Sequence, residues 1–309
     1  MILKDLFGNS SNATLEVTIL DKKSKKLAIK DLDSKSNEYT SKKLPLYIDN
    51  EPLKGRLDIT LDKNKKLDHY GIKAELLGII EVVGDSTATS TFMSNGVDLE
   101  PSGCLHDDKS YDFDFKVFQK PYNSYYGQSI KLRYVVRCSI LVTRTKVISR
   151  DIDVGVIADT EYDDEEVKPI KLEVGIEDLL NIIINIPTNS YYLKDVINGM
   201  ILFENIKVLI KKMKLNIVRK EIIGTGEKAR TTQSEINEFE IMDGCPIKEE
   251  KIPIRMFLAG VSDLTPTMIK INNKFSVRYF LHLAIWDDTN RKFFKQSEIF
   301  LYRNKEQKE

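Results

Sequence analysis

The sequence predicts an all-β protein made of two antiparallel β-sandwiches. Apolar residues recur at every second position in many short segments, turn residues separate those segments, and no long amphipathic helix pattern occurs. Strands with one apolar face, joined by turns, form antiparallel sheets that bury these faces against each other.

The predicted strands follow one another along the whole chain. The period of two appears at Leu15–Ile19, Leu57–Leu61, Ile72–Leu76, Tyr111–Val117, Ile130–Val142, Met213–Ile217 and Phe275–Ile285. We expect turns at Asp49–Pro52, Ser94–Gly96, Gly224–Gly226 and Asp243–Gly244. The segment from Ile130 to Val142 is the clearest strand, because its even positions are apolar and Lys131, Arg133 and Arg137 fall on the other face.

The chain of 309 residues is long enough for two domains. The acidic segment Asp159–Lys168 has few apolar residues and ends at Pro169, as a solvated connection does. We expect an N-terminal sandwich over residues 1–160, a linker over 161–169, a C-terminal sandwich over 170–303 and a polar tail over 304–309. The halves begin alike at Tyr47–Gly55 and Tyr192–Gly199, which fits two related sandwiches or a chance similarity of hairpins.

Composition narrows the function classes. Lys and Arg number 47, as do Asp and Glu, and this zero net charge argues against a nucleic-acid partner. Cys104, Cys138 and Cys245 suit a reducing compartment, with Cys138 in the core. No apolar run approaches the roughly 20 residues that span a bilayer, and the polar start argues against a signal peptide. We therefore expect a cytoplasmic protein.

Candidate catalytic residues are few. His69 falls in a turn-like segment, His282 on the polar face of a strand, and His106 beside Cys104 in a polar segment. A zinc site needs three or four ligands from at least two places, and no second cluster exists. The glycines near Gly224 lack the spacing of a phosphate loop. The sequence predicts no enzyme, no metal and no cofactor.

Ile241 and Met242 stand directly before the turn Asp243–Gly244. Turns normally carry small or polar residues. If both side chains are exposed, they form an apolar patch that binds a partner. If they point inward, they are the end of a core strand, and periodicity alone leaves both readings open.

Six segments carry a resemblance to a known family: GIKAELLGIIEVV (71–83), KPYNSYYGQSIKLRYVVRCSI (120–140), IKLEVGIEDLLNI (170–182), YYLKDVINGMI (191–201), FEIMDGCPIKEEKIPIRMFLAGVSDLTPT (239–267) and INNKFSVRYFLHLAIWDDTNRKFFKQSEIFLYR (271–303). In this order they resemble the vacuolar protein sorting-associated protein 26 family, the arrestin-like subunits of retromer. The resemblance runs from about residue 45 to 303. Residues 1–44 match loosely, and Ser86–Asp108 departs from the pattern.

The resemblance implies an arrestin-like fold and a non-enzymatic member of the retromer trimer, peripheral on the cytosolic face of endosomes. Such a subunit helps to sort membrane-protein cargo to the trans-Golgi network or the plasma membrane. By the family pattern, Ile241 and Met242, followed by Asp243 and Gly244, bind the α-solenoid subunit, vacuolar protein sorting-associated protein 35.

The resemblance also implies a cargo groove formed with a sorting nexin near the junction of the two domains. It would accept the cytosolic tail of a membrane protein, with Val174 and Phe294 as the matching apolar residues; ordinary sandwich core is the alternative for both. Membrane association would be indirect. Alternative functions are a retriever-type arrestin-fold adaptor or, from another class, a β-sandwich ligand-binding protein.

Overall fold

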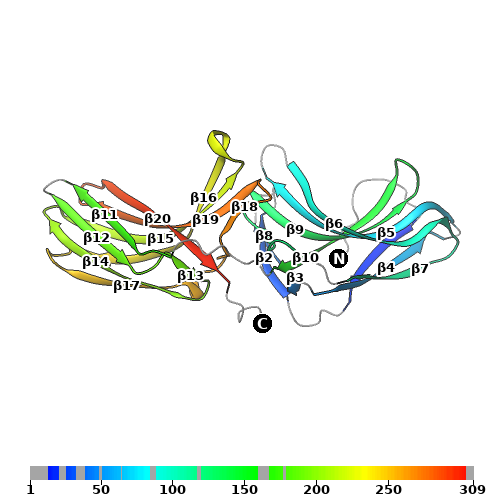
Figure 1. The fold of residues 1–309 in the computed structure, drawn as a ribbon, viewed down its shortest axis with the longest axis horizontal. Coiled ribbons are helices and arrows are strands. Elements are labelled where there is room, and N and C mark those ends of the chain that lie inside the picture. Colours follow the sequence, from blue (N-terminus) through cyan, green and yellow to red (C-terminus); the bar gives the residue numbers. More distant parts are fainter. Residues whose placement is uncertain are drawn as a thin grey trace. The chain divides into compact units, whose positions relative to one another are not determined.

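The computed structural model describes residues 13–20, 26–32, 39–48, 51–63, 65–83, 88–116, 120–158, 167–176 and 179–303. The chain divides into two compact units, Met1–Thr160 and Glu161–Glu309. Strands dominate both units (Figure 1), and helix in the described ranges is limited to the short 3-10 turns η1 (Gly226–Lys228) and η2 (Leu258–Gly260). The predicted all-β, arrestin-like fold is confirmed. Residues 161–166 of the expected linker and the expected tail, 304–309, lie outside the described residues.

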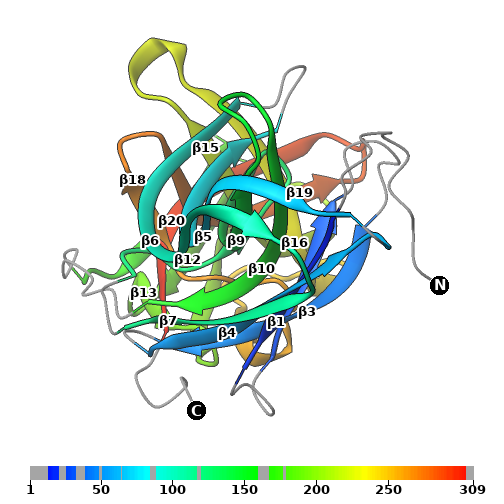
Figure 2. The same ribbon diagram turned by 90° about the vertical axis from the view of Figure 1, so that its right-hand side faces the viewer.

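The described residues of unit 1 form ten strands in two sheets. They are β1 (Ala13–Ile19), β2 (Lys26–Leu32), β3 (Tyr39–Ile48), β4 (Leu53–Leu61), β5 (Leu67–Val82), β6 (Ala88–Leu105), β7 (Lys109–Phe115), β8 (Tyr125–Tyr126), β9 (Ile130–Leu141) and β10 (Val147–Ile157). The smaller sheet has the order β1-β4-β7, and the larger has β2-β3-β10-β9-β5-β6, with β8 added beside β9. The larger sheet is strongly curved (Figure 2).

Unit 2 is built in the same way. Its strands are β11 (Ile170–Ile176), β12 (Leu180–Ile186), β13 (Ser190–Tyr192), β14 (Val196–Ile206), β15 (Ile210–Ile223), β16 (Arg230–Asp243), β17 (Lys251–Phe257), β18 (Met268–Ile271), β19 (Phe275–Asp287) and β20 (Lys292–Tyr302). The smaller sheet has the order β11-β12-β14-β17, and the larger has β13-β20-β19-β15-β16, with β18 added beside β19.

Alternating apolar side chains form the core between the sheets of each unit. Along β9, the residues at even positions from Ile130 to Ile140 are fully buried, as the period of two predicts. Along β19, the residues at odd positions from Phe275 to Ile285 are buried in the same way. Cys138 lies in this core as expected, and burial raises the pKa of its thiol to about 12.

The two units share most of their strand topology and differ at β2, which extends the larger sheet of unit 1, and at β11, which extends the smaller sheet of unit 2. The order β3-β10-β9-β5-β6 in unit 1 matches β13-β20-β19-β15-β16 in unit 2, and β1-β4-β7 matches β12-β14-β17. Each larger sheet also departs from purely antiparallel pairing at the same place, because β3 pairs with β10, and β13 with β20, in parallel. This agreement supports two related sandwiches over a chance similarity of hairpins.

Equivalent turns link equivalent strands. After β3, the Ile48 N–H donates to Glu51 Oε2 at 3.0 Å, and after β13 the Tyr192 N–H donates to Asp195 Oδ2 at 2.7 Å. In each turn the N–H of the acidic residue donates back to the carbonyl of the first residue, at 3.1 Å and 3.0 Å. The similarity of the two sequence segments therefore reflects a repeated, side-chain-capped turn.

A buried tyrosine braces each sandwich. In unit 1 the Tyr134 hydroxyl donates to the Tyr122 carbonyl at 2.8 Å, and in unit 2 the Tyr279 hydroxyl lies 2.8 Å from Thr265 Oγ1. Both hydroxyls also accept a backbone N–H, from Tyr122 at 3.2 Å and from Thr265 at 3.1 Å. Burial raises the pKa of both tyrosines, so both hydroxyls stay protonated.

Two sequence predictions are wrong. Ser94–Gly96 is not a turn but the middle of β6, where these residues pair with Leu77, Leu76 and Glu75. The strand is the outermost of its sheet, and an edge strand tolerates polar residues and glycine. His69 lies in β5, opposite Gly103, and is 4% exposed instead of being in a turn.

The brace of unit 2 gives a stability prediction. Tyr279→Phe removes the acceptor of the Thr265 N–H, and we expect the free energy of unfolding of unit 2 to fall by about 1–3 kcal/mol. Trp286 is the single tryptophan of the chain and lies in unit 2, so its fluorescence during urea unfolding reports this unit. Tyr192→Phe, at a side chain 46% exposed, is the control and should change the value by less than about 0.5 kcal/mol. Equal effects of the two variants would contradict the brace.

Candidate partner-binding surfaces

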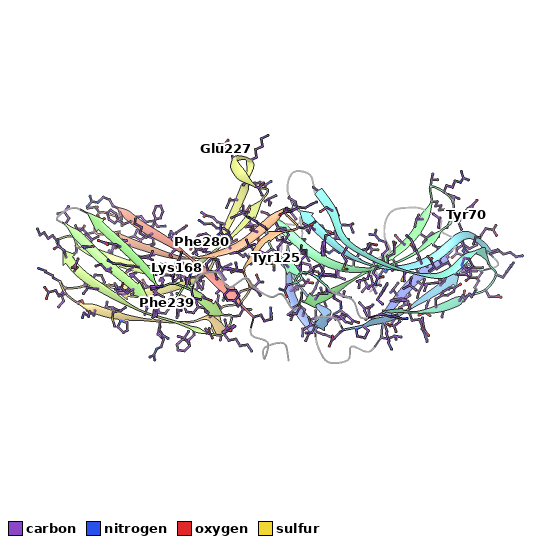
Figure 3. All side chains as sticks on the ribbon, viewed as in Figure 1. Tyr70, Tyr125, Lys168, Glu227, Phe239 and Phe280 are labelled. Atoms are coloured by element: carbon purple, nitrogen blue, oxygen red, sulfur yellow. The ribbon has the colours of Figure 1, made fainter. Side chains whose placement is uncertain are left out.

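The Ile241–Met242 pair lies at the end of β16, the outermost strand of the larger sheet in unit 2. Met242 pairs with Met213 and Glu240 pairs with Lys214, so Ile241 is the extra residue of a β-bulge. A bulge bends an edge strand and redirects its side chains. Ile241 and Met242 are both half-buried. Their burial is intermediate between the two interpretations of the sequence, an exposed apolar patch and the end of a core strand. The turn of the β15–β16 hairpin, which carries Glu227, is at the opposite end of β16 (Figure 3).

Gly244 makes the turn that follows. Its φ of +127° lies in the region that residues with a Cβ rarely adopt. Its N–H donates to the Lys211 carbonyl at 3.4 Å, directly after Asp243 pairs with Lys212. The turn therefore ties the end of β16 to the start of β15 and sets where Ile241 and Met242 lie.

The loop after Gly244 carries an apolar residue that the sequence analysis missed. Ile247 is 71% exposed, whereas Pro246 beside it is buried. The loop is held in place, because the Ile247 N–H donates to Glu250 Oε2 at 2.9 Å and the Glu249 N–H donates to the Phe203 carbonyl at 2.6 Å. The sequence does carry a signal for this exposure, because Ile247 stands between Pro246 and the charged run Lys248–Lys251.

This loop crosses one end of the sandwich of unit 2. It begins beside Lys211 of the larger sheet and ends beside Phe203 of the smaller sheet. The segment between β14 and β15 joins the same two sheets and carries Leu209, which is 56% exposed. We call Leu209, Ile241, Met242 and Ile247 the tip residues.

The two residues predicted to line a cargo groove, Val174 and Phe294, do not lie at one surface. Val174 in β11 is 5% exposed, pairs with Ile182 and lies in the sandwich core. Phe294 in β20 is 62% exposed, while Phe293 beside it is half-buried. Of the two predicted residues, only Phe294 offers a side chain to a partner, because Val174 supports β11 from inside.

A cavity of about 490 Å³ lies between the start of β11 and the end of β20. It is lined by Lys168, Pro169, Ile170, Asn189, Ser297, Glu298 and Phe300. Asn189 fixes one wall by accepting the Lys168 N–H at 3.0 Å, and Glu298 is held by Arg278 through contacts of 2.5 Å and 2.8 Å. Neither Val174 nor Phe294 lines this cavity, so it is not the groove that the sequence predicts.

The described part of the chain also bears on two other functions, binding a metal and crossing a membrane. Within it, no group of three or more His, Cys, Asp or Glu side chains could hold a metal ion. His106 lies in an exposed loop, as the sequence predicts. No helix among the described residues has the length and apolar character needed to cross a membrane.

Comparison with known proteins decides the family. The sequence profile described as Vacuolar protein sorting-associated protein 26 matches residues 10–290. The chain belongs to this family. Vacuolar protein sorting-associated protein 26 of Plasmodium falciparum (isolate 3D7) is 39% identical over 304 residues, which cover 98% of this chain and 99% of that protein.

Animal relatives match over a similar length. Vacuolar protein sorting-associated protein 26B of Danio rerio is 40% identical over 299 residues, covering 96% of this chain and 88% of that protein. The protein of the same name from Homo sapiens is 39% identical over 298 residues, covering 96% and 87%. The family match therefore includes both units.

The positive φ of Gly244 gives a second stability prediction. Gly244→Ala forces a Cβ into a strained conformation, and we expect the free energy of unfolding of unit 2 to fall by about 1–3 kcal/mol. Hydrogen exchange should also show weaker protection of the amides from 241 to 247. Gly260→Ala is the control, since a Cβ at either glycine meets no atom within 4 Å but Gly260 lacks the positive φ. A harmless Gly244→Ala substitution would contradict the argument.

Proposed function

We propose that this protein is the arrestin-like subunit of a retromer trimer and acts as a non-enzymatic adaptor in vacuolar protein sorting. The observation that carries the proposal is the family match, which spans both units. On this proposal the protein works on the cytosolic face of endosomes and reaches the membrane through its partners.

The tip residues are the proposed anchor for the α-solenoid subunit. Aliphatic and thioether side chains fill irregular gaps between helices well. Full burial of such a side chain contributes roughly 1.5–3 kcal/mol, but Ile241 and Met242 are already half-buried and gain less. The more exposed Ile247 and Leu209 would then contribute as much of the binding energy as the family pair.

The outer strand β11 and the exposed ring of Phe294 are the proposed cargo site. A strand at the edge of a sheet can add an extended peptide through main-chain hydrogen bonds, while side-chain contacts give specificity. β11 is the outermost strand of its sheet, and Phe294 offers apolar area on β20. The cavity at the start of β11 could receive one side chain of a cargo tail.

Changing the family pair tests the anchor. We expect Ile241→Asp combined with Met242→Asn to abolish capture of the solenoid subunit in a pull-down, because two polar groups would be buried without partners. Circular dichroism and gel filtration should show a folded protein, since both residues lie at the end of an edge strand.

The chain offers a matched control. Ile269→Asp combined with Met200→Asn changes the same residue types at two sites that are each 40% exposed, on β18 and β14. This control should bind like the wild type. Normal capture by the Ile241→Asp, Met242→Asn protein would overturn the anchor.

Changing Phe294 tests the cargo site separately. We expect Phe294→Ser to weaken capture of a cargo tail roughly tenfold or more, because an exposed aromatic anchor is lost. Assembly with the solenoid subunit should stay intact. Phe257→Ser, at a side chain 58% exposed on β17, should leave cargo capture unchanged. Loss of solubility in Phe294→Ser alone would instead assign Phe294 to the structural core.

A further inference from the structure

His282 lies under Phe294 on the outer face of the larger sheet in unit 2. Leu281 and Leu283 on either side of it point into the core and are fully buried, so His282 points the other way. Its ring stacks with that of Phe294, with 5.6 Å between centroids and 24° between planes. His282 is 8% exposed although it lies on an outer face, so its neighbours cover it.

A chain of hydrogen bonds sets the protonation state of His282. Lys220 Nζ lies 2.8 Å from Gln296 Oε1, and the other end of this amide lies 2.8 Å from His282 Nδ1. A lysine ammonium only donates, so the amide oxygen must face Lys220 and the amide nitrogen must face His282. An amide nitrogen also only donates. Nδ1 therefore accepts, and the neutral ring carries its proton on Nε2.

We infer that neutral His282 positions Phe294 for cargo binding, and that protonation of His282 releases Phe294 from this position. The inference rests on the proposed cargo role of Phe294. It makes His282 a positioning residue that acts through Phe294, and it makes the cargo site sensitive to acid.

The charged ring loses its partner on the β20 side. A protonated imidazole donates at both nitrogens, and the Gln296 amide nitrogen offers it no acceptor. Rotating that amide would turn its NH₂ group toward the ammonium of Lys220. The neutral form is therefore the one that fits beside Gln296.

The β15 side offers the charged ring an alternative. Asn216 lies opposite His282 in the strand register, and its Oδ1 has no hydrogen-bond partner in the described part of the chain. Its Nδ2 donates to Glu235 Oε2 at 3.1 Å, which brings a carboxylate to the same side. An imidazolium is attracted to this side, and moving there breaks its stacking with Phe294.

The surrounding charges set the pH range. Burial, followed by Lys292 of β20 and Lys220 of β15, lowers the pKa of His282 below its ordinary 6.5, while Glu235 of β16 opposes them. The ring is thus neutral at pH 7 and gains a proton only in acid. Because the unfolded chain protonates first, the contribution of His282 to stability is complete above pH 6.5 and falls as the pH drops below it.

Fluorine NMR of the full chain tests the positioning directly. With 4-fluorophenylalanine at position 294, we expect one ¹⁹F signal that shifts on acidification, with a midpoint below pH 6.5. Nitrogen-15 NMR of histidine should give the same midpoint for His282 and a proton on Nε2 at about pH 7.5. Gln296→Leu removes the donor to Nδ1, so both midpoints should move upward.

Two histidine variants decide the outcome. In His282→Phe the ring at position 282 cannot titrate, so the ¹⁹F signal should not respond to pH. In His106→Phe, which changes a histidine in an exposed loop, the response should persist. An unchanged acid response in His282→Phe, or a proton on Nδ1 in the wild type, would overturn the inference.

A binding arm separates this inference from the proposed function. The probe is a synthetic extended peptide with one aromatic and one aliphatic residue, added with the sorting nexin and the full chain. We expect capture to be roughly two- to tenfold weaker at about pH 5.5 than at about pH 7.5, the loss expected for one aromatic contact, and to lose this ratio in His282→Phe. If Phe294→Ser captures the probe like the wild type, the cargo assignment fails while the ¹⁹F result still reports the positioning.

Discussion

The parallel pairing of the short strand β13 with β20 is the constraint on which the proposed cargo site depends. It joins Ser190–Tyr192 to Phe300–Tyr302 and closes the larger sheet of unit 2 at one end of β20. The earlier part of β20, from Lys292 to Glu298, extends beyond the reach of β13. Unit 1 uses the same pairing between β3 and β10, but β3 has 10 residues where β13 has 3. The shortness of β13 leaves the space beside β20 in which the cavity next to β11 lies.

At the opposite edge of the same sheet, ion pairs and a β-bulge protect the outermost strand. β16 is the outermost strand, and an unpaired strand edge invites aggregation. Acidic side chains of β16 form ion pairs with lysines of β15, Glu240 with Lys212 and Glu238 with Lys214. Charges of this kind and a bulge protect the strand along its length. Its apolar residues, from Ile236 to Met242, are half-buried, and the strongly exposed Ile247 follows after the strand has ended. In the proposed function, this difference in exposure favours Ile247 and Leu209 as the first apolar contacts of the solenoid subunit.

Residue periodicity predicted most of the fold, because strands with one buried face show their pattern directly. The strands expected at Ile130–Val142 and Phe275–Ile285 are core strands, of which the first ends at Leu141. Periodicity does not predict the structure where the position of a segment in the fold overrides its local preference. Ser94–Gly96 is tolerated inside β6 because this strand lies at an edge. The exposure of Ile247 follows from a loop held to both sheets, and this arrangement leaves no periodic trace.

The sequence by itself determined the all-β class, the family and the residues for two proposed binding surfaces. These depend on local alternation and on segment similarity, both of which are properties of the chain alone. Only the tertiary structure decided that Phe294 is strongly exposed while Phe293 is half-buried, since either of two adjacent phenylalanines could face outward from a strand. It also decided that His282 lies between Gln296 and Asn216, because strand register brings together residues that are far apart in the chain.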